Sequence, residues 1–334
     1  MQVRFSFLLV TVMALSSFSQ DQIKQVSAEF VFERAPFPSC HASTVVELAN
    51  GELLCAWFGG KDEGDPSVGI WLSRRAASGW SPPIEVAKEK SVPCWNPVLF
   101  TVGDRLWLYY KVGESPTQWT GASRSSTDGG KTWSDQRLLP SGLLGPVRAK
   151  PIRLASGEIF AGSSTESYRA WTGWAEISRD GGDTWQRFGP LALPDENHGL
   201  IQPTVWEAEP GHVFALLRAR RPIGRICRAE SFDGGRTWGP AKKTDLLNPS
   251  AGIDAVKLAD GRVALVYNPT ERERFPLSVA ISRDNGATWT QPFHLETMPG
   301  EFSYPAMIQT KDNLLHVTYT WQRLRIKHAI LEVH

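Results

Sequence analysis

The chain has 334 residues, of which 41% are hydrophobic and 10% aromatic, and this is enough apolar material for a large buried core. Its 36 Lys and Arg against 35 Asp and Glu give a formal net charge of +1 without a basic block. This balance argues against a nucleic-acid-binding protein, which needs clustered positive charge to neutralise phosphates. The 29 Gly, 23 Pro and 14 Trp, beside only 4 Met, favour a turn-rich β protein.

The N-terminal residues have the pattern of an export signal. Arg4 supplies a positive start, an apolar stretch follows over Phe5–Leu15, and Ser17–Ser19 form a small-x-small cleavage site. The apolar stretch is shorter than the roughly 20 residues that span a membrane, and no later segment reaches that length. We therefore expect residues 1–19 to be a signal peptide and residues 20–334 to form one secreted or periplasmic domain with no membrane span.

An eight-residue motif of the form Ser-x-Asp-(Gly/Asn)-Gly-x-Thr-Trp recurs along the chain. Complete copies begin at Ser126, Ser178, Ser231 and Ser282, and a worn earlier copy keeps only Ser73 and Trp80. The starts are spaced by 53, 52, 53 and 51 residues, a regularity typical of repeat architectures. In each copy the Ser and Asp can bond the turn backbone, the glycines allow positive φ and the Trp can pack between sheets. We interpret these boxes as structural.

A second pattern lies between the boxes and consists of two short, alternating apolar runs around a turn, as in residues 44–57. It occurs six times, with turns at Gly51, Gly103, Gly157, Gly211, Gly261 and Asn313. A hairpin followed by a boxed hairpin makes four strands per unit. Six such units predict an all-β fold, a six-bladed β-propeller with four-stranded antiparallel blades. The alternating strand Ala28–Glu33, before the first unit, is expected to complete the last blade and close the ring.

The antiparallel order places the boxes on one face of the ring and the start of each first strand on the opposite face. At these starts each unit offers one polar residue: His41, Asn96, Lys150, Gln202, Asp254 and Tyr304. The loops after the second strands lie on the same face and add charged side chains: Asp62, Asp65, Lys111, Glu166, Arg218, Arg220, Arg272, Arg274, Arg323 and Arg325. Guanidinium forks suit carboxylates, and Asp and Tyr suit acid–base or nucleophilic chemistry. The alternative for any single charge is an ordinary solvated loop residue.

With these boxes and six units, the chain resembles the sialidase (neuraminidase) superfamily, whose members are six-bladed propellers with such Asp boxes, or BNR repeats. The resemblance covers nearly all of residues 20–334. It implies a secreted, exo-acting glycoside hydrolase of the sialidase type that cleaves a terminal acidic sugar, a sialic acid or a relative, from a glycan or glycoconjugate.

The resemblance also implies roles for individual residues. Asp62, 11 residues before the worn box, matches the family's acid/base, and Asp65 is the fallback. Tyr304 matches the nucleophile, as in sialidases generally, where a Tyr replaces the usual carboxylate. Arg218 and Arg274 match two of the three arginines that bind the substrate carboxylate.

Two positions depart from the family pattern. The family's first arginine lies in an Arg-Ile-Pro motif, whereas this chain has no Arg in residues 40–43 and offers His41 there. The Glu that partners the family's Tyr is Gln202 in this chain, and a neutral amide cannot act as a base. Lys150, Asp254 and Glu166 are candidates for that missing role. Together with Asn96, they are also expected to contact the substrate.

These departures keep two other functions open. One is a glycan lyase, or a hydrolase of uronic-acid or rhamnose-containing polysaccharide, in which His41 and Tyr304 move protons. The other is a non-catalytic carbohydrate-binding propeller. For His41 the structural alternative is a residue that only ties neighbouring blades together.

The sequence predicts no metal and no organic cofactor, because its 7 His and 4 Cys nowhere cluster at ligand spacing. A calcium ion in a loop stays open. Cys40, Cys55, Cys94 and Cys227 are too scattered for a disulfide framework, so most are expected in the core.

Overall fold

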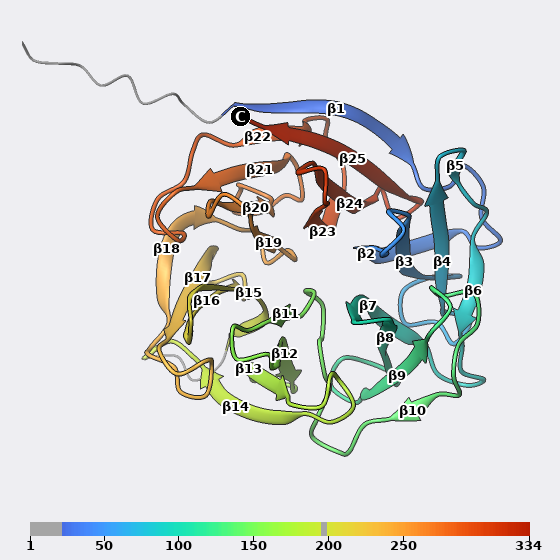
Figure 1. Cartoon of the computed structure of the whole chain (residues 1–334), viewed down its shortest axis with the longest axis horizontal. Coiled ribbons are helices and arrows are strands. Elements are labelled where there is room, and N and C mark those ends of the chain that lie inside the picture. Colours follow the sequence, from blue (N-terminus) through green and yellow to red (C-terminus); the bar gives the residue numbers. More distant parts are fainter. Residues whose placement is uncertain (1–21, 195–198) are drawn as a thin grey trace, which may run out of the picture.

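The computed structural model describes residues 22–194 and 199–334, in which six antiparallel sheets surround a central axis (Figure 1). The predicted export signal lies outside these residues. Blade 1 consists of β2 (Ser39–Glu47), β3 (Leu53–Gly60), β4 (Gly69–Ala76), β5 (Gly79–Trp80) and β6 (Ile84–Ala87). Blade 2 consists of β7 (Cys94–Val102), β8 (Arg105–Val112), β9 (Thr120–Ser126) and β10 (Arg137–Leu138). Blade 3 consists of β11 (Ile152–Arg153), β12 (Ile159–Glu166), β13 (Trp171–Ser178) and β14 (Gln186–Leu191).

The second half of the ring repeats this plan. Blade 4 consists of β15 (Leu200–Glu209), β16 (His212–Ala219), β17 (Arg225–Ser231) and β18 (Lys242–Leu247). Blade 5 consists of β19 (Asp254–Lys257), β20 (Val263–Tyr267), β21 (Leu277–Ser282) and β22 (Phe293–Glu296). Blade 6 consists of β23 (Phe302–Gln309), β24 (Leu315–Trp321), β25 (Arg325–Val333) and, from the other end of the chain, β1 (Ile23–Phe30). The prediction of a six-bladed β-propeller is confirmed.

The ring closes where β1 runs antiparallel to β25, with Ala28 opposite Ala329 (Figure 1). Closure was predicted, but the strand bounds were wrong, because β1 ends at Phe30 rather than Glu33. Phe32 fits the alternating apolar pattern although it lies outside the strand, because its ring stacks on Trp57 of blade 1 with the centroids 4.9 Å apart. The alternating pattern therefore merged a strand with a segment that packs between blades.

The core is a set of apolar layers between neighbouring blades. One layer joins Leu54 and Ile70 of blade 1 to Leu99 and Leu108 of blade 2, and the corresponding layers join blades 3 and 4 and blades 5 and 6. Inner strands are buried on both faces, as in β8, whose six central residues are all buried. The four cysteines are all buried. No helix within the described ranges is long and apolar enough to span a membrane.

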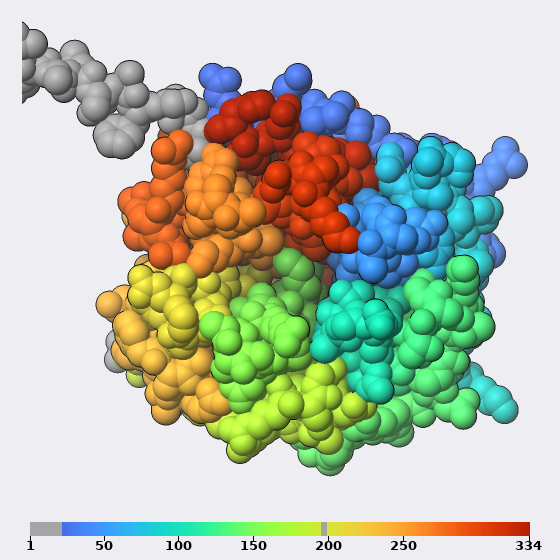
Figure 2. Space-filling view, viewed as in Figure 1, coloured from blue at the N-terminus to red at the C-terminus, as the bar shows by residue number. Residues whose placement is uncertain are grey.

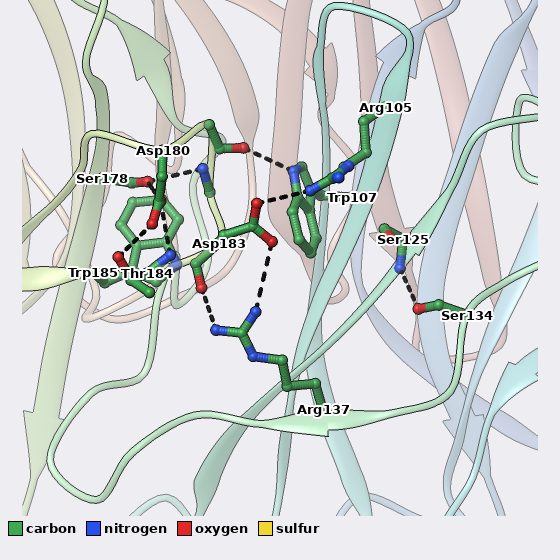
Figure 3. Close-up of polar contacts among 12 residues, drawn as sticks. Arg105, Trp107, Ser125, Ser134, Arg137, Ser178, Asp180, Asp183, Thr184 and Trp185 are labelled. Carbon is green, nitrogen blue, oxygen red and sulfur yellow. Dashed lines mark hydrogen bonds and ion pairs between the residues drawn. The ribbon is translucent and has the colours of Figure 1, made fainter.

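The boxes fasten blades together on the face away from the strand starts, as Figure 3 shows for the copy in blade 3. Thr184 donates from N to Asp180 Oδ1 at 2.8 Å and from Oγ1 to Asp180 Oδ2 at 2.5 Å, and Gly182 N donates to Ser178 Oγ at 2.8 Å. Trp185 Nε1 donates to Tyr109 Oη of blade 2 at 2.8 Å. The two bonds from the box Thr to the box Asp recur at Asp128, Asp233 and Asp284. Their role is structural, as interpreted.

Four inner strands contain a β-bulge that places their polar residues. The ladder skips two residues in β2, β7, β15 and β23, and the first skipped residue has positive φ: Ala42, Asn96, Gln202 and Tyr304. The sequence prediction placed these groups before the strands, whereas the strands continue through the bulges. It also aligned His41 one residue off, because Ala42 holds the position equivalent to Tyr304.

Candidate active site

Tyr304, at the bulge of β23, is the centre of the candidate site. β23 is the strand of its blade next to the ring axis (Figure 1), and the space-filling view is hollowed at the middle of the ring (Figure 2). The Tyr304 hydroxyl oxygen accepts a hydrogen bond of 2.7 Å from Arg218 Nη1. The guanidinium carbons of Arg148, Arg218 and Arg274 lie 5.3, 5.7 and 5.8 Å from the centroid of its ring. Blades 3, 4 and 5 thus each direct an arginine at one tyrosine of blade 6.

Arg218, at the end of β16, is held by partners on three sides. Its Nη1 also donates to Gln202 Oε1 at 3.3 Å, and its Nε donates to Ser250 Oγ at 3.3 Å. Its guanidinium carbon lies 5.4 Å from the Trp171 ring centroid. Gln202 is therefore connected to Tyr304 through Arg218, and it orients the arginine.

Arg148 is one of the site residues that the sequence analysis missed. It is 3% exposed, its Nη2 donates to the carbonyl oxygen of Pro305, and burial lowers the pKa of its guanidinium. Its Nε and Nη1 have no partner among the described residues. The pattern of strand starts gave no signal for it, because Arg148 lies at a bend before β11.

A carboxylate network extends the positive cluster toward blade 1. Glu301 Oε1 lies 2.7 Å from both Arg274 Nη1 and Arg323 Nε, and Arg323 Nη1 lies 2.5 Å from Glu63 Oε2. Against the raising effect of burial, Arg323 and Arg274 hold the pKa of Glu301 below its ordinary value. Neither Glu301 nor Glu63 was predicted for the site. Glu301 lies just before β23, and Glu63 lies in the loop from which only Asp62 and Asp65 were selected.

His41 joins blade 1 to blade 6 and also touches the central tyrosine. Its Nδ1 is 2.9 Å from Thr320 Oγ1, and its ring centroid is 4.2 Å from that of Tyr304. Burial and the nearby arginines, Arg323 foremost, hold the pKa of His41 well below its ordinary value, so the ring is neutral. Its Nε2 is buried and has no partner within the described part of the chain. The structural and functional interpretations of His41 are therefore compatible.

Blades 1 and 2 give the site an aromatic side. Ring contacts run from His41 to Phe58, Trp95 and Trp119, with successive centroid distances of 5.6, 6.0 and 6.1 Å. Trp95 Nε1 donates to the Gly113 carbonyl oxygen at 2.8 Å, which fixes the indole. One side of Tyr304 is thus lined with guanidinium groups and the other with aromatic rings.

The model of the BNR repeat-like domain family matches residues 51–317. The chain belongs to the BNR repeat-like family. This match confirms the predicted resemblance to the Asp-box propellers of the sialidase superfamily. A sialidase of Bacteroides fragilis (strain YCH46) is 28% identical over 232 residues, which are 61% of this chain and 41% of that protein. A sialidase of Micromonospora viridifaciens is 25% identical over 218 residues, 58% of this chain and 32% of that protein.

The chain therefore matches less than half the length of these two relatives. A solved structure described as a protein of unknown function from Dyadobacter fermentans DSM 18053 superposes with a TM-score of 0.81 at 20% identity, covering 93% of this chain and 99% of that one. At this identity the likeness supports the fold alone.

The two aspartates proposed for this BNR propeller as acid/base lie in the loop between β3 and β4. This loop contacts the aromatic side, since a Cβ added to Gly64 would be 3.5 Å from the Trp95 ring. Asp62 is exposed, and its Oδ1 accepts from Glu63 N at 2.8 Å. Asp65 Oδ1 accepts from Ser67 N at 2.8 Å, and hydrogen bonds from Ser67 lower the pKa of Asp65. A lowered pKa suits a general acid poorly, which speaks against Asp65 in that role.

Lys150 and Asp254 face each other rather than Tyr304. Asp254 Oδ2 lies 2.9 Å from Lys150 Nζ and accepts from Met307 N at 2.8 Å, while its Oδ1 accepts from Thr204 Oγ1 at 2.9 Å. With Asp254 only 1% exposed, this network ties the inner strands together around the axis. In the structure as described, no carboxylate hydrogen-bonds to the Tyr304 hydroxyl.

Three other polar residues of this face differ in their surroundings. Glu166, at the end of β12, has a pKa raised by burial, an effect that the charge of Arg218 opposes. Asn96 is buried at the bulge of β7. Lys111 is fully buried, donates to the Pro146 carbonyl oxygen at 2.8 Å, and has a pKa lowered by burial to about 7, so it is not a solvated loop charge. The described residues contain no cluster of three or more His, Cys, Asp or Glu able to hold a metal.

Proposed function

We propose that this chain is a secreted, exo-acting glycoside hydrolase of the sialidase type, which releases a terminal acidic sugar, a sialic acid or a relative, from a glycan. The observation that carries the proposal is the position of Tyr304, whose hydroxyl bonds to Arg218 and whose ring lies within 5.8 Å of three guanidinium carbons. A tyrosine beside convergent arginines suits an anomeric carbon that bears a carboxylate. The two curated relatives named as sialidases support the same activity.

In this proposal Arg218, Arg274 and Arg323 bind the substrate carboxylate. They come from blades 4, 5 and 6, and Glu301 joins the last two at 2.7 Å each. Arg323 also compensates for the arginine that is missing at His41. Its carbonyl oxygen accepts a hydrogen bond from Cys40 N at 2.8 Å. Among the charged groups that lower the pKa of His41, the Arg323 guanidinium has the largest effect.

The chemical step uses groups on both sides of the sugar. Asp62 donates a proton to the glycosidic oxygen as the bond from that oxygen to the anomeric carbon breaks, and the Tyr304 oxygen attacks or stabilises that carbon. Gln202 cannot accept the phenolic proton, so this proton passes to a solvent water, and Arg218, which bonds to the Tyr304 oxygen, stabilises the negative charge left there. A water molecule that gives a proton to Asp62 then attacks the anomeric carbon, and the sugar leaves the Tyr304 oxygen.

The direct test is turnover of 4-methylumbelliferyl sialoside by the purified protein. Asp62→Asn is expected to abolish turnover while sugar binding persists, and Asp65→Asn is the matched control from the same loop. Sialoside binding without turnover by the unmodified protein would instead indicate the non-catalytic propeller. Secretion is tested separately, by mass spectrometry of exported protein, which is expected to begin near Gln20.

One observation favours a second candidate, a lyase or hydrolase of uronic-acid-containing polysaccharide. The unpartnered Nε2 of neutral His41, whose ring is 4.2 Å from that of Tyr304, offers a second group for proton transfer beside the tyrosine. An absorbance assay for unsaturated uronate, run on polyuronate substrates with the unmodified protein and with His41→Gln, separates a lyase from the leading proposal. A set of uronide and rhamnoside substrates tests the corresponding hydrolase.

A further inference from the structure

A pocket of about 330 Å³ lies next to the candidate site, between the loops of blades 3, 4 and 5. It shares Arg218 and Arg274 with the site and continues to Arg220 and Arg221, in the loop after β16. Its volume is at the low end of the range for small-ligand pockets, about 300–1,000 Å³. The pocket is thus positioned to receive the part of a substrate that adjoins the terminal sugar.

Two arginines of this pocket, Arg218 and Arg220, are fixed by neutral partners. Trp171 packs against two of them, with ring-centroid distances of 5.4 Å to the Arg218 guanidinium carbon and 5.5 Å to that of Arg220. Arg220 Nη1 donates to the Arg169 carbonyl oxygen at 3.0 Å. A tryptophan face and a carbonyl oxygen hold a guanidinium in place without cancelling its charge.

Little negative charge opposes these arginines. In the described ranges no carboxylate forms an ion pair with Arg218, Arg220 or Arg221, and the pocket is not lined by any Asp or Glu. Arg274 alone is paired, with Glu301. The nearby Glu166 is partly buried, and burial raises its pKa. Among the residues that the structure describes, Arg218, Arg220 and Arg221 therefore offer guanidinium forks that no carboxylate of the protein occupies.

We propose that this pocket binds a second anionic group of the substrate, a sulfate, phosphate or carboxylate carried by the glycan next to the terminal acidic sugar. The substrate class is then a glycan with two neighbouring negative groups, one at Tyr304 and one at Arg220 and Arg221. This assignment rests on the proposed function, since the first group is the carboxylate of the sugar to be released. Guanidinium groups suit all three oxyanions because each presents paired oxygens to the fork.

The test begins with inorganic sulfate, titrated calorimetrically into the full chain at constant ionic strength. Arg220→Gln/Arg221→Gln is expected to weaken sulfate binding by about tenfold, the effect of losing charged hydrogen-bond donors. Arg225→Gln is the matched control from the next strand, because Arg225 Nη1 donates to the Asp245 carbonyl oxygen outside this pocket and its loss should leave sulfate binding unchanged. The single variant Arg221→Gln, at an exposed side chain, covers the case in which the double variant does not fold.

Substrate comparison then identifies the source of the second charge. Sialyl-lactosamine, its sulfated and phosphorylated forms and a disialyl glycan are compared by kcat/KM, and at least one doubly charged form is expected to exceed the singly charged one by several-fold in the unmodified protein and not in the double variant. Unchanged sulfate binding in the folded variants, or no preference for any doubly charged form, would overturn the pocket assignment while sialoside turnover stands. If no sialoside is turned over, the proposed function fails, and the sulfate titration still decides whether the pocket binds anions.

Discussion

The two sides of the candidate site are built on different principles. On the arginine side, formed by Arg148, Arg218, Arg274 and Arg323, the charges are positioned by hydrogen bonds and ion pairs, such as the 2.7 Å contacts of Glu301. On the aromatic side, formed by His41, Phe58, Trp95 and Trp119, the rings are positioned mainly by packing on one another. The arginine side therefore selects the charge of a ligand, and the aromatic side gives it a shaped wall next to the loop of Asp62.

Tyr304 belongs to both sides, so its loss is expected to have the largest effect. Tyr304→Phe removes the oxygen that bonds to Arg218 and leaves the ring that packs on His41. We expect sialoside kcat to fall by about a thousandfold or more, as for a lost nucleophile, with the fold retained because the ring volume is nearly unchanged. Steady-state kinetics with circular dichroism as the folding control measure this, and a variant that keeps more than a tenth of the activity would remove the tyrosine from the mechanism.

The arginine side is tested by Arg218→Lys and Arg274→Lys. An ammonium group keeps the charge but cannot form the bidentate fork, so we expect KM for a sialoside to rise by about ten- to a hundredfold. Trp119→Phe on the aromatic side is the control, and its KM should change much less. An equal rise in KM in all three variants would show that the arginine side does not bind the substrate charge more strongly than the aromatic side does.

Much of this arrangement was predictable, because the repeat period fixes both the blade count and the face on which the strands start. That logic places Tyr304, Arg218 and Arg274 on one face, and the resemblance to sialidases selects these two arginines from the other loop charges. The repeat period does not predict the role of a residue whose role depends on which side chain it pairs with. Asp254 begins a strand as predicted, but it pairs with Lys150, and nothing in a repeat period shows which axial side chains satisfy one another. Arg148 lies before β11 and outside every strand, so the choice of one residue per strand start did not include it.

Gln202→Glu gives a sharper test of the arginine side with a smaller expected effect. Gln202 Oε1 already bonds to Arg218 Nη1 at 3.3 Å, so a carboxylate of nearly the same shape would bind the same guanidinium and could accept a proton. For a sialidase mechanism we expect sialoside kcat to rise several-fold without a change in thermal stability. A fall in native activity would instead favour the uronic-acid reaction, because the added charge repels a substrate whose acid group lies there.

The junction of blades 6 and 1, where the two sides meet, is expected to weaken in acid. His316 Nδ1 lies 2.9 Å from His328 Nε2, and burial lowers the pKa of both rings, to about 4 for His316. His316 therefore stays neutral in the fold down to about pH 4, whereas its ring in the unfolded chain takes up a proton below about pH 6.5, so stability falls as the pH drops from about 6.5 towards 4. We expect a melting temperature several degrees lower at the acid end of this window. His316→Gln should flatten the profile, and an unchanged profile in that variant would exclude the pair as its cause.

A crystal structure of the protein with a bound sialic acid tests the central claim most directly. The account predicts the sugar carboxylate in hydrogen-bonding contact with Arg218 and Arg274, the anomeric carbon next to the Tyr304 oxygen and the Asp62 loop above the glycosidic position. A sugar bound elsewhere on the propeller, or one whose carboxylate points away from these arginines, would contradict it.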